Sequence, residues 1–304
     1  MSSRFKTPSF SIVIPTRNRP KLLRDCLLGI ESQQFDGQLD AVIIVDNGDS
    51  DNDVRHVVEG FYSALPVSYH HSGTPGVSRA RNLGLYESQS EFTVFLDDDE
   101  IPFANWLKEM AEPFTDDGIS ADIVAGNYTP LWDVPRPDWL TDDYLGLYSV
   151  SLSYGDTPRF LNSGEWVLEG NVGVRTELMR SIGGFDEGLG REGDSLVSGE
   201  GVVYSQLVES GAKLFYNPNC LVKHLIHPDR LHKKWLQKRM FAAGITQAQQ
   251  ERNGLIETKS IPPVSVNLEV LSRVQLDSLA EEDLLHFMQI YEMFGYVLRK
   301  QRIL

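Results

Sequence analysis

Apolar runs of strand length alternate with segments of helical periodicity along the first hundred residues. The expected strands are 10–14, 41–45, 67–71 and 92–96. The expected helices between them, which carry apolar residues on one face, are 20–30, 54–61 and 77–87. Alternation of strands and helices predicts the α/β class, with a mostly parallel sheet flanked by helices.

The second half of the chain has a less regular pattern. Residues 127–165 are rich in Pro, Trp, Tyr and Asp and predict an irregular region that shapes a pocket. Further predicted features are strands at 166–175 and 212–216, a turn at 183–186, a helix at 200–210, a linker at 261–263 and a terminal amphipathic helix at 284–298. We therefore expect one domain over residues 1–230, with halves at about 9–127 and 128–230, and a helical C-terminal extension over 231–304.

Polar residues follow three of the predicted strands. The motifs are Thr16-Arg17-Asn18, Asp46-Asn47 and Asp97-Asp98-Asp99. Ligands of open α/β sheets bind beyond the carboxyl ends of the strands, so these side chains should gather at one edge. This common edge is the first indication of a site.

Three successive carboxylates end the strand at 92–96. Asp97, Asp98 and Asp99 repel one another, and a divalent cation removes that cost. Mg²⁺ prefers one or two protein carboxylates together with phosphate oxygens, so a nucleotide diphosphate would complete its coordination shell. A solvated acidic loop is the alternative, and acidic pairs after strands also occur in phosphatases and receiver domains.

Two arginines precede the acidic strand. Arg79 and Arg81 lie in the segment 76–84, and a planar guanidinium suits phosphate because it donates two parallel hydrogen bonds. An exposed helix face is the alternative explanation for both. Asp46, at the end of its strand, can accept hydrogen bonds from a nucleobase or a ribose.

Charge and length narrow the possible partners and location. The chain has 304 residues and a formal net charge of -15, which repels nucleic-acid backbones and argues against a polynucleotide partner. Cys26 and Cys220 lack partners at metal-ligand spacing and are expected to be reduced core residues. The N-terminus lacks the apolar run of a signal peptide, so the expectation is a cytoplasmic protein, with peripheral contact to a membrane left open.

In its motifs, the chain resembles family 2 glycosyltransferases of the GT-A fold over roughly residues 9–230. The resemblance is carried by Ser11 to Asn18, Val45-Asp46-Asn47, Ala80 to Gly84, Phe95 to Asp99, Gly183 to Asp186 and Gly199-Glu200. It implies a nucleotide-sugar donor, with a UDP-sugar favoured, and a Mn²⁺ or Mg²⁺ cofactor. The acceptor would be a saccharide, a lipid-linked molecule or a small molecule, bound by residues 128–230.

The resemblance also implies roles for individual residues. The expected nucleotide-binding residues are Pro15, Thr16, Arg17, Asp46, Arg79, Arg81, Asp97 and Asp98. Pro15 and Thr16 would line the base pocket. Asp99 would bind the metal ion directly, and Asp97, the other acid of the metal motif, would lie nearer the ribose. His224 would complete the metal shell, with His227 as the competing candidate.

The expected catalytic base is Glu200, at the start of a helix that follows the Gly-Gly-Phe-Asp turn. A helix N-terminus favours the ionised carboxylate that a base requires. The family usually has two consecutive acids here, whereas Gly201 follows Glu200, so Asp194 is the fallback. The implied reaction is a single displacement with inversion at the anomeric carbon.

Three further interpretations stay open at the sequence level. The aromatic residues Trp132, Trp139, Tyr144 and Trp166 either stack on a sugar or pack in the core. A nucleotidyltransferase is the first rival function, but it would normally carry a glycine-rich loop with a basic residue after its first strand. This chain has Pro15 to Pro20 there, without glycine, which argues against that rival. A degenerate, non-catalytic carbohydrate- or nucleotide-binding protein is the second rival, and Gly201 is the feature in its favour.

Overall fold

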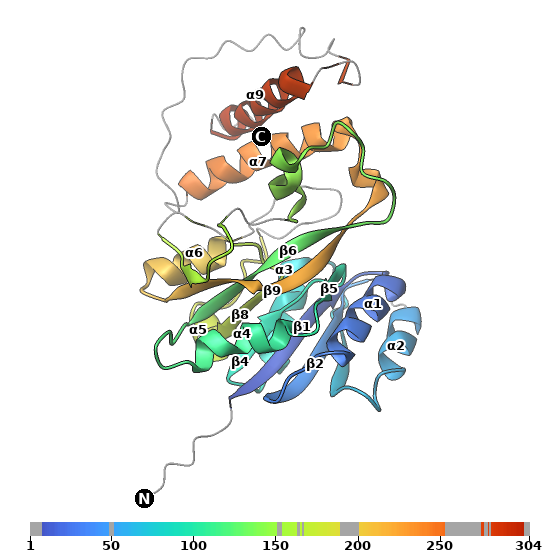
Figure 1. Ribbon diagram of the computed structural model, residues 1–304, viewed down its shortest axis with the longest axis vertical. Helices are drawn as coiled ribbons and strands as arrows, with labels where there is room; N and C mark the ends of the chain where they lie inside the picture. The colour runs from blue at the N-terminus through green and yellow to red at the C-terminus, as the bar shows by residue number, and fades with distance from the viewer. Residues whose placement is uncertain are drawn as a thin grey trace, which may run out of the picture.

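The computed structural model describes residues 8–48, 52–150, 154–162, 165, 167–188, 201–252, 275–276, 279 and 281–300 (Figure 1). The strands are β1 (Ser9–Thr16), β2 (Gln38–Asp46), β3 (Val67–His71), β4 (Phe92–Phe95), β5 (Glu100–Pro102), β6 (Ile123–Trp132), β7 (Arg159–Phe160), β8 (Val172–Arg175) and β9 (Leu214–Ile226). The helices are α1 (Pro20–Glu31), α2 (Asn52–Glu59), α3 (Val77–Glu87), α4 (Trp106–Thr115), α5 (Thr176–Ser181), α6 (Val202–Glu209), α7 (Lys233–Arg252) and α9 (Glu281–Lys300). Two short 3-10 helices are η1 (Asp142–Tyr148) and η2 (Pro228–Arg230).

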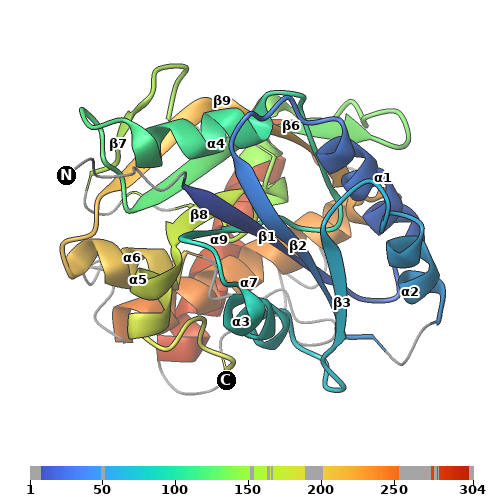
Figure 2. The same cartoon turned by 90° about the horizontal axis from the view of Figure 1, so that it is seen from below.

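The strands form one mixed sheet, in the order β3-β2-β1-β4-β8-β6-β9-β5, and β7 pairs with β9. The four strands β3, β2, β1 and β4 are parallel, as the alternating pattern predicts. Strand β8 is antiparallel to both β4 and β6, whereas β6 and β9 are parallel. The parallel half places the ends of β1, β2 and β4 at one edge, as Figure 2 shows for the neighbouring strands β1 and β2.

Strand β1 is buried along its whole length and separates two hydrophobic clusters. Ile12 packs in the first cluster with Leu23 of α1 and Trp106 of α4. Val13 points to the opposite face and packs in the second cluster with Ala80 of α3. Successive side chains of a strand point to opposite faces, so helices cover both sides of the sheet, as expected. Cys26 and Cys220 belong to the first cluster and are buried free thiols, also as expected.

The second half differs from the sequence prediction in its boundaries. Strand β9 continues through residue 226 instead of ending at 216, because β6, β5 and β7 all pair with it. Strand β8 covers only 172–175, and α6 begins at Val202. The sequence analysis identified neither β5 nor α4. The region 127–165, expected to be irregular, contains the last part of β6 together with η1 and β7.

Helices α7 and α9 pack against each other and against η1 (Figure 1). A third hydrophobic cluster joins them to the sheet through Ile226 at the end of β9, with Tyr144, Leu236 and Met288 among its members. Glycines allow a close approach, since a Cβ atom at Gly244 would lie 1.8 Å from the Glu292 carbonyl oxygen. Among the described residues, no helix combines the length and the apolar character needed to span a bilayer.

Candidate active site

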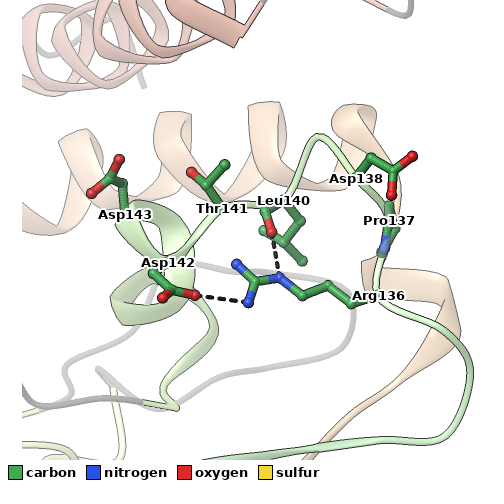
Figure 3. A pocket seen from close by; sticks show the side chains of 7 residues that line it. All are labelled: Arg136, Pro137, Asp138, Leu140, Thr141, Asp142 and Asp143. Carbon is green, nitrogen blue, oxygen red and sulfur yellow. Dashed lines mark hydrogen bonds and ion pairs between the residues drawn. The ribbon is translucent and has the colours of Figure 1, made fainter.

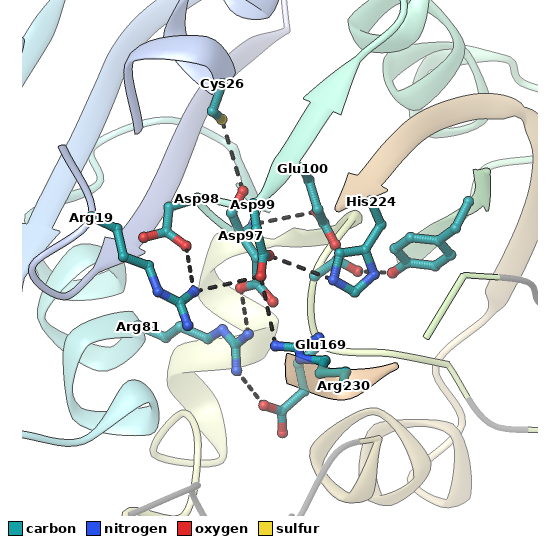
Figure 4. Close-up of polar contacts among 12 residues, drawn as sticks. Arg19, Cys26, Arg81, Asp97, Asp98, Asp99, Glu100, Glu169, His224 and Arg230 are labelled. Atoms are coloured by element: carbon teal, nitrogen blue, oxygen red, sulfur yellow. Dashed lines mark hydrogen bonds and ion pairs between the residues drawn. The ribbon is translucent and has the colours of Figure 1, made fainter. Parts of the chain in front are cut away.

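The Asp97-Asp98-Asp99 motif, whose side chains Figure 4 shows, follows β4 in the middle of the sheet and precedes β5, the last strand in the strand order. Strand β5 pairs antiparallel with β9, and this pairing sets Glu100 opposite His224. The amide of Leu225 donates to the carbonyl oxygen of Asp99 at 2.9 Å. The crossing from β4 to β5 therefore carries the acidic motif to β9, which is more than a hundred residues away in sequence.

Three basic side chains surround Asp99, which is only 7% exposed. Its Oδ1 atom lies 3.6 Å from His224 Nε2, and its Oδ2 atom lies 3.5 Å from Arg19 Nη1 and 3.9 Å from Arg230 Nη2. Burial raises the pKa of Asp99, but His224, Arg230 and Arg19 outweigh burial, so the pKa lies well below its ordinary value. Asp99 is therefore ionised.

Asp98 turns the other way, toward β1. Thr16 Oγ1 donates to Asp98 Oδ2 at 2.7 Å, and Arg19 Nη1 donates to Asp98 Oδ1 at 3.1 Å. Burial and the neighbouring Asp99 raise the pKa of Asp98 to about 7, against the opposing effects of Arg19 and Thr16. Asp98 and Thr16 were both expected at the nucleotide. In this arrangement they bind each other and tie the acidic motif to the end of β1.

Asp97 is held by a buried arginine. Arg81 Nη2 donates to Asp97 Oδ1 at 2.7 Å, and Arg81 Nη1 donates to Glu169 Oε2. The Arg81 side chain is 4% exposed, whereas that of Asp97 is 32% exposed. Arg81 was expected to bind phosphate, but its guanidinium is enclosed between two carboxylates. The structure therefore gives Arg81 a positioning role, in which it orients Asp97.

The other predicted basic residues are at the surface. Arg79 donates from Nε to Glu187 Oε2 at 3.0 Å and from Nη1 to the Pro75 carbonyl oxygen at 2.9 Å. An ion pair across the surface thus occupies Arg79, which the sequence analysis had placed at the nucleotide. Arg17 is exposed just beyond β1, and Pro15 is buried within that strand.

Asp46 lies fully buried at the end of β2, where it was expected. Its Oδ1 accepts from the Gly48 amide and its Oδ2 accepts from the Tyr69 hydroxyl, both at 2.9 Å. Burial and the hydrogen bond to Asp46 raise the pKa of Tyr69 to about 12. The adjacent amide of Asn47 donates to the Thr16 carbonyl oxygen, which joins the ends of β1 and β2. Asn47 Oδ1 is buried without a partner among the residues described here, so it can accept a hydrogen bond.

His224 has the environment of a metal ligand, although it lies inside β9 and not after a strand as expected. Its Nδ1 atom is 2.7 Å from the Ser149 carbonyl oxygen, which accepts from Nδ1–H and leaves Nε2 facing Asp99. Nε2 is the ring nitrogen that can bind a metal ion once it has lost its proton. Burial lowers the pKa of His224. Asp99 and the hydrogen bond to the Ser149 carbonyl raise it by more than burial lowers it, so the pKa lies above its ordinary value. In the described part of the chain Asp99 pairs with His224 and not with His227, whose Nε2 is buried without a partner.

The donor set fits a divalent cation only in part. Within the described ranges, no three His, Cys, Asp or Glu side chains converge into a ready metal cluster. Asp99 and His224 supply a carboxylate oxygen and an imidazole nitrogen that face each other. A Mg²⁺-type ion with few protein ligands takes its remaining oxygens from phosphate and water. Asp99 and His224 therefore fit an ion that binds together with a diphosphate.

Glu100 is a site residue that the sequence analysis missed. Its Oε2 accepts from the Asp97 amide at 3.2 Å, and a Cβ atom on Gly170 would lie only 2.6 Å from Glu100 Oε1. Burial, Asp97 and Asp99 raise the pKa of Glu100 well above its ordinary value, which favours the neutral acid. Its position as the fourth acid in a row was the available signal. Arg19 and Glu169 had no comparable signal, because each acts through residues distant in sequence.

The two candidate bases, Glu200 and Asp194, lie outside the described residues, as does Trp166. The description resumes at Gly201, whose φ of 80° is left-handed, and α6 follows directly. Tyr204 of α6 is 1% exposed, and the charges of Glu169 and Arg81 are close enough to shift its pKa. The first turn of α6 therefore lies near the network that holds Asp97.

The remaining aromatic candidates pack against protein. Tyr144 is buried, and Trp139 contacts it edge-on with ring centroids 6.5 Å apart. The guanidinium of Arg136 lies over the ring of Trp132, with its Cζ atom 5.5 Å from the ring centroid. The same segment forms an open hollow of about 520 Å³, so part of the region expected to shape a pocket does so (Figure 3). Its lining residues are Arg136, Pro137, Asp138, Leu140, Thr141, Asp142 and Asp143.

Replacing Arg81 should reveal how strongly the buried network is coupled to the fold. Arg81→Leu leaves Asp97 and Glu169 without their cation, and losing one partner of a buried ion pair costs about 3–5 kcal/mol of unfolding free energy. Arg175→Leu is the matched control, because Arg175 also bridges two carboxylates, Glu91 and Asp122, but near the surface. Its loss should cost at most about 1 kcal/mol. Equal losses in urea unfolding would contradict the buried role of Arg81.

Comparison with known proteins places this architecture among sugar-transferring enzymes. The profile described as glycosyl transferase family 2 matches residues 11–165. A pre-mycofactocin glycosyltransferase of Mycobacterium tuberculosis is 29% identical over 237 residues, which cover 77% of this chain but only 46% of that protein. A glucosyl-dolichyl phosphate glucuronosyltransferase of Haloferax volcanii is 23% identical, with 85% of each chain covered. The chain thus spans about half the length of the mycobacterial relative.

Solved structures share the fold at low sequence identity. Staphylococcus aureus TarS 1-349 in complex with UDP-GlcNAc matches with a TM-score of 0.58 and 14% identity, covering 97% of this chain and 91% of that chain. The mannosyltransferase PcManGT of Pyrobaculum calidifontis, in complex with GDP-Man and Mn²⁺, matches with a TM-score of 0.59 and 17% identity. The match covers 98% of this chain and 74% of that chain. The profile match extends over slightly more than half of the chain, and the strand order places the acidic motif beyond β4. The chain belongs to glycosyl transferase family 2 and has the GT-A fold.

Proposed function

We propose that the protein transfers a sugar from a nucleotide-diphosphate sugar, with a UDP-sugar favoured, to a hydroxyl group of an acceptor. The observation that carries this proposal is the pairing of Asp99 with His224 at the sheet edge where Asp46 also ends its strand. The structures of TarS with UDP-GlcNAc and of PcManGT with GDP-Man and Mn²⁺ support the donor class and the cation. Their donors share a nucleotide diphosphate and differ in base and sugar.

In this proposal the ends of β1, β2 and β4 form the donor site. Asp46 accepts hydrogen bonds from the base or ribose, with Pro15 and Thr16 beside it. Asp99 and His224 hold a Mn²⁺ or Mg²⁺ ion, while Asp97 lies toward the ribose. The bound cation supplies positive charge that stabilises the departing nucleotide diphosphate. Arg81 keeps Asp97 in place through its ion pair.

The proposed chemistry is a single displacement that inverts the anomeric carbon. Glu200, directly before Gly201 and α6, removes the proton from the acceptor hydroxyl as that oxygen attacks from the face opposite the leaving group. Asp194 is the alternative base. Residues 9–127 then form the nucleotide-binding half, residues 128–230 form the acceptor half, and residues 231–304 form the helical extension. The acceptor is a saccharide, a lipid-linked molecule or a small molecule.

A thermal-shift experiment tests the donor class. UDP and GDP are each added with and without Mn²⁺, and one nucleotide should raise the melting temperature most strongly when Mn²⁺ is present. A ligand at a hundredfold excess over its dissociation constant stabilises the folded state by about 2.7 kcal/mol. No shift with any nucleoside diphosphate would reject the donor site. Binding without donor hydrolysis or transfer would favour the degenerate binding protein.

Asp46→Ala should weaken donor binding more than it lowers turnover at saturation. A ribose or base contact is much the same in the ground state and in the transition state, so its loss raises KM and leaves kcat nearly unchanged. Steady-state kinetics with the identified donor measures both constants. Asp36→Ala removes an exposed acid near β2 and should change neither. A large drop in kcat at constant KM would assign Asp46 to the chemical step.

A further inference from the structure

The carboxylate of Asp99 is surrounded by positive charge on two sides. Arg19 Nη1 lies 3.5 Å and Arg230 Nη2 lies 3.9 Å from the same oxygen, Oδ2, while His224 faces Oδ1 (Figure 4). Arg19 comes from the connection after β1, and Arg230 comes from η2 after β9. A divalent cation that approaches Asp99 alone meets this positive charge. Asp99 is therefore a poor site for a metal ion without a second anion.

The two arginines differ from the buried Arg81 in their exposure. The Arg19 side chain is 42% exposed and that of Arg230 is 19% exposed, against 4% for Arg81. Arg19 also pairs with Asp98, which already receives a hydrogen bond from Thr16. Their carboxylate partners are buried at 6% side-chain exposure, but both guanidinium groups reach solvent and can turn to another anion that arrives from it. A guanidinium donates two parallel hydrogen bonds to a phosphate group, so a diphosphate is a suitable alternative partner.

We propose that Arg19 and Arg230 bind the diphosphate of the donor and release Asp99 to the metal ion as they do so. This inference rests on the proposed function and deepens it, because it assigns the cationic side of the leaving-group site. The nucleotide brings the negative charge that the arginines require, and their departure removes the positive charge that opposes the metal ion. Metal ion and nucleotide therefore bind synergistically, and each binds weakly alone.

The test measures the two ligands separately by isothermal titration calorimetry. Arg19→Gln should bind Mn²⁺ alone about fivefold more tightly than the parent protein, since a competing charge near Asp99 is gone. The same variant should bind UDP or GDP in metal-free buffer about fivefold more weakly, since a phosphate contact is lost. Arg24→Gln is the matched control: Arg24 is exposed on α1, and its loss removes the same charge. It should alter neither affinity.

The expected gain in Mn²⁺ affinity and loss of nucleotide affinity distinguish a direct role of Arg19 in ligand binding from a purely structural role. If Arg19 only stabilised the fold, its replacement would weaken both ligands or neither, and either result would overturn the inference. Arg230→Gln is the second variant and should give the same pair of changes, and circular dichroism confirms that each variant is folded. A parent protein that binds no nucleoside diphosphate with or without Mn²⁺ would reject the proposed function itself. If the parent protein binds both ligands but the variants do not show tighter Mn²⁺ binding and weaker nucleotide binding, this inference is rejected and the proposed function stands.

Discussion

Asp99→Ala should abolish the dependence of nucleotide binding on Mn²⁺ while the protein remains folded. Asp99 is the ionised carboxylate that faces His224, and its removal leaves the imidazole as a single ligand of that pair. In the parent protein, Mn²⁺ should raise the affinity for UDP or GDP by about tenfold or more, within the usual range of coupling between two ligands. In the variant this ratio should fall to about one. Calorimetric titration of nucleotide with and without Mn²⁺ measures it.

The stability of the same variant is a second measurement. From the sequence alone, the removal of one of three adjacent acids was expected to relieve repulsion. The structure adds an opposing effect, since Asp99 also pairs with Arg19, Arg230 and His224. We therefore expect a folded protein without a gain in melting temperature. Asp117→Ala, at an exposed acid, is the control and should retain full metal dependence. Unchanged Mn²⁺-dependent binding in Asp99→Ala would reject the metal assignment.

Glu200→Gln should lower sugar transfer by about a hundredfold or more, the usual effect of losing a general base. The amide keeps the shape of the side chain and its capacity for hydrogen bonding, so donor binding should be retained. Slow donor hydrolysis should persist, because water is small enough to react without precise activation. The observation that supports Glu200 is its place directly before Gly201 and α6, whose Tyr204 lies near enough to Arg81 and Glu169 for their charges to shift its pKa.

Asp194→Asn is the matched comparison for the base. Both substitutions remove one carboxylate from the same part of the chain, so the variant that loses transfer identifies the base. Initial rates of transfer to the true acceptor and of donor hydrolysis are measured for both proteins. Near-normal transfer by the Glu200→Gln enzyme, together with a large loss in Asp194→Asn, would move the assignment to Asp194. Full transfer by both would reject this segment as the source of the base.

Local pattern accounts for most of the first half of the fold. The apolar runs and helical segments up to residue 96 correspond closely to β1 through β4 and to the helices between them. Strands β1 and β4 and the last five residues of β2 are buried, and a helix follows each of β1, β2 and β3 directly, so neighbouring residues already carry the signal. The pattern was less informative after residue 100, where long-range pairing decides the boundaries. The short strand β5 exists because β9 pairs with it.

The order of residues is enough to show which strand ends carry acids, and therefore where Asp46 and the Asp97 to Asp99 motif gather. A residue's position after an apolar run is a local property that survives folding. The partners of these acids, in contrast, depend on how distant segments come together in the fold. Arg81 became a buried support because Glu169, which lies 88 residues later, faces it. His224 meets Asp99 because β5 pairs with β9, and Arg19 meets it because β1 pairs with β4. The charge around a carboxylate depends on such distances, which the order of residues does not contain.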